Sequence, residues 1–230
     1  MKNCSASDRH ITRRILWSAC ASALTLALTV TLSQPAHAQR ITPPSVPADI
    51  QVPEGAKAFL EGHGKGTQDY ICLPCPNPTT PAKQCPDATG FAWLLFTPEA
   101  TLFDDDDEAV TTHFFSPNPF ENGTIRATWQ HSRDTSTVWG GQAIASSDPK
   151  FVAAGAIPWL KLPMAGVAQG PAGGDTLTQT SFIQRVNTSG GAAPSTGCTS
   201  AANVGSKAFV PYTADYIFYT GHDDGSADGN

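Results

Sequence analysis

The sequence predicts an all-β fold, an antiparallel sandwich or barrel that forms a single compact domain. Glycine and proline are frequent, with 20 and 19 residues among 230, and they gather with Asn and Asp in turn-like clusters. Short apolar or alternating runs recur between these clusters, as strands do. No segment keeps a helical apolar period over about ten residues, which argues against long helices.

The expected strands follow an extended leading segment, residues 39–52, that carries three prolines. They cover residues 56–62, 68–72, 91–96, 109–115, 124–131, 137–145, 157–162, 178–186 and 208–219. The last run is rich in aromatic residues, which favour strands and which we expect in the core. Its aromatic residues are Phe209, Tyr212, Tyr216, Phe218 and Tyr219.

Four polar or glycine-rich segments are expected to connect or follow these strands. Residues 62–67, with three glycines, predict a β-turn, and the acidic run 104–108 predicts a solvated hairpin turn. Residues 167–175 predict a long mobile loop, and residues 221–230 a disordered tail.

The first 38 residues have the features of a signal peptide. Their start is basic, residues 15–32 are apolar and uncharged, and Ala36-His37-Ala38 fits the small-x-small pattern of a cleavage site. A retained membrane anchor is the alternative, but Ser and Thr dilute the apolar run and the cleavage site ends it. Arg13-Arg14 also fits a twin-arginine signal, so the export route stays open. We expect a secreted or periplasmic protein with no stable membrane insertion after cleavage near Ala38.

Cleavage there would leave 192 residues, enough for one domain, which we place at residues 53–220. The mature chain would carry 10 basic and 19 acidic residues, a formal net charge of −9. Such a charge argues against nucleic acid and anionic membrane surfaces as partners.

Four cysteines remain in the mature chain: Cys72, Cys75, Cys85 and Cys198. In an oxidising compartment they are expected to form two disulfides, and three pairings are possible. Cys72-Leu73-Pro74-Cys75 has the spacing of a thiol oxidoreductase, but the prolines that follow it cannot continue the helix such a motif opens. A four-cysteine zinc site is disfavoured because exported cysteines are usually oxidised first.

Catalytic signatures are weak. Residues 104–108 lack the spacing of a calcium loop, no histidine pair has metal-ligand spacing, and no dinucleotide-binding or serine-hydrolase motif is found. We therefore expect no metal and no cofactor. Carboxylates at Glu99, Asp134 and Asp215 could supply paired acids for glycoside chemistry. The candidate catalytic set is Glu99, His113 and Asp215.

Binding residues are suggested by polar groups inside apolar strands. Gln68 and Tyr70 share one strand face, and Gln184 and Arg185 interrupt another apolar run, so these side chains could line a pocket. The structural alternative is that Arg185 forms an ion pair, with Glu99 or Asp215, while the amides satisfy buried backbone groups. The tryptophans Trp129, Trp139 and Trp159 are expected to be exposed and to contact a ligand.

Five blocks in order resemble a family of secreted bacterial and fungal proteins known only as domain of unknown function 3455. The similarity runs from about Val52 to Tyr219. The blocks are Gly66-x-Gln68-x-Tyr70-x-Cys72, Pro98-Glu99-Ala100-x-Leu102-Phe103-Asp104, Ile157-Pro158-Trp159-Leu160, Ile183-Gln184-Arg185-Val186-Asn187-Thr188 with Gly190-Gly191, and Val210-Pro211-Tyr212-x-Ala214-Asp215-Tyr216-x-Phe218-Tyr219.

The resemblance implies export and a compact domain, and it supplies no catalytic residues. It supports a Cys72–Cys198 disulfide, which leaves Cys75 with Cys85. The chain departs from the family pattern at two insertions, residues 73–89 and residues 116–125. The second lies between His113 and Trp129, so it would disturb a site that contains both.

The sequence alone leaves the biochemical function unassigned. The leading hypothesis is a non-catalytic envelope or extracellular module that binds a small ligand or a wall polymer, through Gln68, Tyr70, Trp129, Trp139 and Arg185. The alternative is a secreted hydrolase that uses the carboxylates and His113.

Overall fold

Nine β-strands and three short 3-10 helices make up the described part of the chain, residues 41–75 and 90–221 of a computed structural model. Cys85, the predicted signal peptide and nearly all of the predicted tail lie outside the described residues. The strands are β1 (Lys57–Pro74), β2 (Phe91–Phe103), β3 (Ala109–Asn118), β4 (Thr124–His131), β5 (Thr137–Gly140), β6 (Ile144–Ser146), β7 (Trp159–Ala168), β8 (Phe182–Gly190) and β9 (Lys207–Thr220). The 3-10 helices are η1 (Ala48–Ile50), η3 (Pro119–Glu121) and η4 (Ala201–Asn203).

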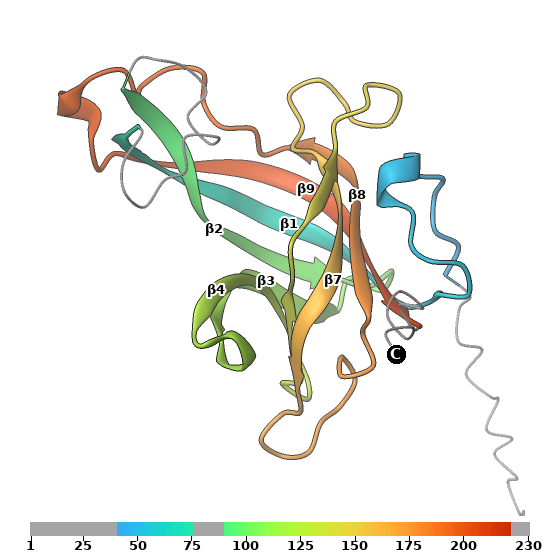
Figure 1. Cartoon of the computed structure of the whole chain (residues 1–230). Coiled ribbons are helices and arrows are strands. Elements are labelled where there is room, and N and C mark those ends of the chain that lie inside the picture. Colours follow the sequence, from blue (N-terminus) through green and yellow to red (C-terminus); the bar gives the residue numbers. More distant parts are fainter. Residues whose placement is uncertain (1–40, 76–89, 222–230) are drawn as a thin grey trace, which may run out of the picture. The chain divides into compact units, whose positions relative to one another are not determined.

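The sheet closes on itself. Its strand order is β5-β4-β3-β2-β1-β9-β8-β7-β6, and an additional β5–β7 pairing joins the two ends. Eight antiparallel strands therefore form a closed ring, with β6 attached to β7 outside it (Figure 1). The prediction of an antiparallel all-β domain is confirmed. Of the two predicted architectures, sandwich and barrel, the chain forms the barrel.

Strand β1 is the longest strand of the barrel, and it contains a segment predicted to be a turn. Residues 62–67 run through the middle of β1, paired with β2 and with β9. The prediction of a β-turn is wrong because the glycines serve packing between strands. A Cβ at Gly64 would lie 2.8 Å from the Tyr216 ring, and one at Gly66 would lie 2.0 Å from the Glu99 carbonyl oxygen.

Side chains alternate between the lumen and the outer face of the barrel, as successive residues of a strand must. The lumen holds a hydrophobic cluster that includes Leu102, Trp129, Val138, Ile183 and Phe218. Four aromatic residues of β9 are buried as predicted, whereas Phe209 is exposed.

A second cluster covers the outer face of β8 and β9. There Phe182, Val186 and Ile217 pack with Ile50 of η1 and with Trp159. The leading segment is anchored at this place by Gln184, whose Nε2 donates to the Ile50 carbonyl oxygen at 2.7 Å. Gln184 therefore satisfies a buried backbone carbonyl group, the structural alternative given above for the buried amides. It does not face the lumen.

Two connections lie where the sequence places them. Residues 104–108 form the hairpin turn between β2 and β3, in which the Asp104 carboxylate accepts from the backbone N–H groups of Asp106 and Glu108. Strand β7 extends to Ala168, so it covers the start of the predicted loop at 167–175. The rest of that loop is fastened by Thr176, which donates to the Asp134 carboxylate through its backbone N–H and its hydroxyl.

One disulfide is described in full. It joins Cys72 to Cys198, 126 residues apart, the pairing that the resemblance supports. Cys75 is also disulfide-bonded, and Cys85, expected to be its partner, lies outside the described residues. Within residues 41–75 and 90–221, no helix has the length and apolar character needed to cross a membrane.

Gly66→Ala should destabilise the barrel. A Cβ at this position would overlap the backbone of β2, which cannot move without breaking its pairing with β1. We expect a loss of about 1–3 kcal/mol in the free energy of unfolding, measured by urea denaturation. Lys65→Ala, on the adjacent exposed position, is the control and should change little; equal stability of the two variants would contradict the packing argument.

Removing the long disulfide should destabilise the protein through the unfolded state. A Cys72→Ser, Cys198→Ser double variant releases a loop of 126 residues, which the chain-entropy model values at about 4–5 kcal/mol. Denaturation under non-reducing conditions measures the difference. Equal free energies of unfolding for the wild type and the variant would show that this disulfide does not stabilise the protein.

Candidate ligand-binding site

The barrel encloses a cavity of about 340 Å³ that opens between β4, the β5–β6 connection and the segment before β7. Most of its lining side chains are apolar, and none of those from the described residues carries a carboxylate. The polar or aromatic lining residues are Gln68, Tyr70, His113, Phe115, Arg126, Trp129, Arg185 and Tyr216. The cavity therefore combines apolar walls with a few polar groups, which is typical of small-molecule sites.

A line of polar groups crosses the lumen over β1, β9 and β8. The hydroxyl groups of Tyr212 and Tyr216 are 2.9 Å apart, and the Tyr70 hydroxyl donates to the Gly191 carbonyl oxygen at 2.6 Å. Burial raises the pKa of Tyr216, while contacts with Arg185 and Tyr212 oppose that rise. These phenols therefore remain neutral and act as hydrogen-bonding groups.

His113 and Trp129 form a stacked pair on the opposite wall. Their ring centroids are 4.2 Å apart and the ring planes differ by 8°. The two residues are direct partners in the β3–β4 register, and the insertion at 116–125 forms the hairpin beyond them, which contains η3. The insertion therefore leaves this pair intact.

His113 is a neutral imidazole. Burial lowers its pKa to about 3, against a hydrogen bond to the Thr128 carbonyl oxygen that raises it. Since Nδ1 donates to that carbonyl oxygen at 2.9 Å, Nε2 carries the lone pair. His113 thus contributes a flat surface and no positive charge to the cavity.

Arg185 lies in the cavity without an acidic partner. Its side chain is 8% exposed, and Nη2 donates to the Pro158 carbonyl oxygen at 2.8 Å. Within the described residues it forms no ion pair, so neither Glu99 nor Asp215 balances its charge. Asp69 is close in sequence to the lining residues Gln68 and Tyr70, but it faces the other side of β1.

The side chains of the candidate catalytic residues do not converge. The His113 ring stacks on Trp129 in the lumen, whereas the Glu99 side chain is exposed on the outer surface. Glu99 and His113 border one open surface hollow, but His113 is 4% exposed and its Nδ1 donates to the Thr128 carbonyl oxygen. Asp215 is also outside, because its neighbours Ala214 and Tyr216 in β9 point inward. A fourth residue, Asp134, uses its carboxylate for bonds to Ser136 and Thr176. The carboxylates and His113 are therefore on different faces of the barrel wall.

The expectation of three exposed tryptophans is wrong. Trp129, Trp139 and Trp159 are 1%, 8% and 5% exposed. Trp129 fills the lumen, Trp139 packs against Phe120 and donates to Ser116, and Trp159 belongs to the outer cluster. A turn-rich sequence gives no sign that both faces of the sheet are covered, so it does not reveal that these indole rings are buried.

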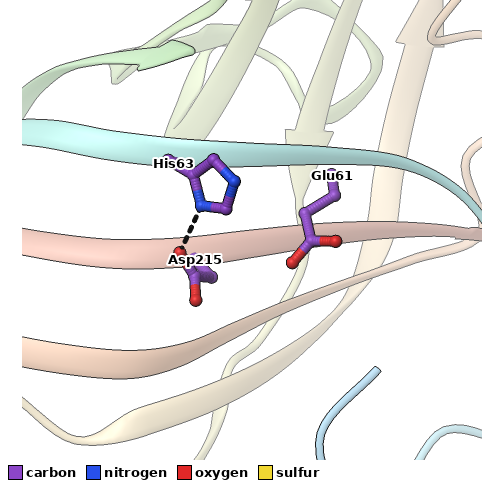
Figure 2. Close-up of side chains that lie close together, drawn as sticks. All are labelled: Glu61, His63 and Asp215. Atoms are coloured by element: carbon purple, nitrogen blue, oxygen red, sulfur yellow. Dashed lines mark hydrogen bonds and ion pairs between the residues drawn. The ribbon is translucent and has the colours of Figure 1, made fainter. Parts of the chain in front are cut away.

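A second polar cluster, which the sequence did not reveal, lies on the outer face of the barrel (Figure 2). Glu61 and His63 of β1 share this face with Asp215 of β9, and their potential ligand atoms lie within 4.8 Å of one another. His63 Nδ1 is 2.7 Å from Asp215 Oδ1, and Nε2 is 3.0 Å from Asp105 Oδ1. The Glu-x-His spacing on a strand was the available signal, but Asp215 joins only through the β1–β9 pairing.

These three residues could hold a divalent cation, because imidazole and carboxylates are suitable ligands. The cluster also satisfies itself without a metal. The hydrogen bond with Asp215 raises the pKa of His63, and burial together with Asp215 raises the pKa of Glu61. A protonated His63 between Asp215 and Asp105 then supplies the positive charge that a cation would supply.

His63→Gln should reduce stability in a pH-dependent way. Because the folded pKa of His63 lies above its ordinary value of 6.5, its contribution is complete below that value and is lost as the pH rises through the folded pKa. The melting temperatures of wild type and variant should therefore differ at about pH 5 and converge at about pH 9. A difference in melting temperature that widens with rising pH would contradict the raised pKa of His63.

Comparison with known proteins identifies the family of the chain. A family model described as "Protein of unknown function (DUF3455)" matches residues 53–220, which includes all strands of the barrel. Searches of curated proteins and of solved structures returned no significant match. The chain therefore belongs to the family of unknown function DUF3455.

Proposed function

We propose that this protein is an exported, non-catalytic module that binds a small, largely apolar molecule in the lumen of its barrel. The observation that carries the proposal is the lumen cavity itself, which is lined mainly by apolar and aromatic side chains. Its volume of about 340 Å³ is roughly twice that of the ~150 Å³ apolar cavity known to bind benzene. A molecule of one or two rings would fit.

The position of the aromatic residues favours a small ligand over a wall polymer. A polymer site needs aromatic rings on an accessible surface, and all three candidate tryptophans are buried. Trp129 instead presents its ring to the cavity, stacked on His113. A molecule that enters the lumen would meet this stacked pair.

The hydrolase alternative receives no support from the geometry. Acid–base chemistry requires its groups within hydrogen-bonding reach of one substrate atom. The Glu99 and Asp215 side chains lie on the outer face of the barrel wall, and the His113 ring is stacked on Trp129 on the inner face. Glu99 and His113 border one surface hollow, but the His113 ring is turned away from it.

Export is supported by two features. The signal-like residues 1–38 precede the family domain, and a disulfide ties Cys72 to Cys198. Disulfides persist in oxidising compartments and are rare in the cytosol.

Filling the cavity should abolish binding and preserve the fold. Ala127 lines the cavity, so Ala127→Phe would place a ring in its space. The neutral apolar dye N-phenyl-1-naphthylamine should bind the wild type, seen as increased dye fluorescence. The variant should lose at least about tenfold in affinity, because the ring takes the volume of the dye.

Ala145→Phe is the matched control, since the same ring is added at an exposed position of β6. It should bind the dye like the wild type. Absence of dye binding to the wild type, or equal binding by both variants, would remove the support for a ligand in the lumen.

A further inference from the structure

We propose that the ligand of the lumen is a monoanion, a carboxylate joined to a flat apolar body, with the carboxylate at Arg185. This inference rests on the proposed function and deepens it, because it names the chemical class of the ligand. It is carried by a buried guanidinium and buried N–H groups that lack partners. The Glu61–His63–Asp215 cluster carries no such proposal, since His63 and Asp215 bond each other and Asp215 also accepts from Asn187.

Arg185 carries a permanent positive charge, because a guanidinium is not deprotonated in proteins. A buried charge is normally paired or removed during evolution, since an unpaired one is costly. Here Arg185 is 8% exposed as a residue and its Nε is buried. Among the described residues it has no acidic partner, and no carboxylate lines the cavity. A ligand that brings a negative charge would supply what the protein lacks.

The unpaired hydrogen-bonding atoms of the lining residues are donors. Arg185 Nε and Gln68 Nε2 are both buried and have no acceptor. Gln68 is 2% exposed, so its amide belongs to the buried wall of the cavity. Trp129 Nε1 is a third buried donor without an acceptor. A carboxylate offers two oxygens and about four acceptor positions, which suits such a set.

The tyrosines connect the two main donors. The Tyr212 and Tyr216 hydroxyls are 2.9 Å apart, and Gln68 and Arg185 lie close enough to them to lower the pKa of Tyr212 and of Tyr216 respectively. Neither Gln68 Nε2 nor Arg185 Nε has hydrogen-bond geometry with these hydroxyls, so both donors stay available. The polar groups therefore form one continuous patch on β1, β9 and β8. This patch faces an otherwise apolar cavity, so the ligand has one charged end.

The charge of the ligand is limited to one. His113 is neutral at physiological pH, since burial lowers its pKa to about 3. Arg126, at the rim, is already paired with Glu121 through two hydrogen bonds of 2.7 Å. Arg185 is then the one uncompensated cation among the described lining residues.

The apolar walls specify the rest of the molecule. The stacked rings of His113 and Trp129 provide a flat surface, and Leu160 and Leu162 lie on β7 across the lumen. A planar ring system bearing one carboxylate matches both the shape and the polarity of this space.

The experiment compares 2-naphthoate with 2-naphthamide, two probes of nearly equal shape that differ in charge. Isothermal titration of the wild type should show naphthoate binding roughly ten- to a hundredfold more tightly, the range expected for a hydrogen-bonded charge. Arg185→Met keeps an unbranched apolar stem and removes the charge. It should lose this preference and still bind naphthamide as the wild type does.

Arg133→Met is the matched control, because Arg133 is exposed and pairs with Glu108 on the surface. Its preference for naphthoate should be unchanged. Gln68→Met is the second lumen variant and should weaken naphthoate severalfold with little effect on naphthamide, so the inference can still be judged if Arg185→Met does not fold.

The outcomes separate the two proposals. Equal affinity of the wild type for naphthoate and naphthamide would overturn the anion inference and leave the lumen as an apolar site. Failure of both probes to bind would overturn the proposed function together with it. A preference for naphthoate that survives in Arg185→Met, or that Gln68→Met leaves undiminished, would show that the charge is recognised elsewhere.

Discussion

The pairing between the first and the last strand is the constraint on which the rest of the structure depends. Strand β1 is paired with β9 from Lys57 with Thr220 to Ile71 with Lys207. Without this contact the sheet would be an open meander with two edges and one face in water. With it, every strand has a lumen side and an outer side, and both sides of β8 and β9 are covered.

Small and large residues divide the lumen into a filled half and an open half. On β1 the lumen positions Gly62 and Gly64 leave room for Leu102 and for the Tyr216 ring. Farther along the same strand, Gln68 and Tyr70 occupy the equivalent positions and line the cavity. The glycines therefore have a packing role, because the space beside them is filled by large side chains of neighbouring strands.

The sequence was sufficient for the features that local patterns encode, namely the all-β class, most strand positions and the hairpin turn at 104–108. The sequence was misleading where the position or burial of a residue depends on closure of the barrel. The glycines at 62–67 predict a turn, and only the large side chains of neighbouring strands explain why they lie inside β1. Trp139 and Trp159 look available for binding until the packing on the outer face is known.

For the cavity too, the sequence indicates some of the residues but not the direction in which they point. Gln68, Tyr70 and Arg185 are recognisable in the sequence as polar residues in apolar strands, and all three line the cavity. The sequence does not tell which face each strand presents. Adjacent residues such as Gln184 and Arg185 therefore look equivalent, although one binds the leading segment outside and the other faces the lumen.

Arg185 relates stability to the proposed function. Leucine or methionine at this position would fill the same space without the desolvation of a charge, and such replacements of buried charged groups are often neutral or stabilising. In the barrel Arg185 is held by its bond to the Pro158 carbonyl oxygen, but no acidic group of the described residues compensates its charge. A bound anion would compensate the charge and would stabilise the folded state in proportion to the logarithm of its concentration over Kd. An uncompensated buried charge that is stabilised by a bound anion is consistent with a preformed recognition site.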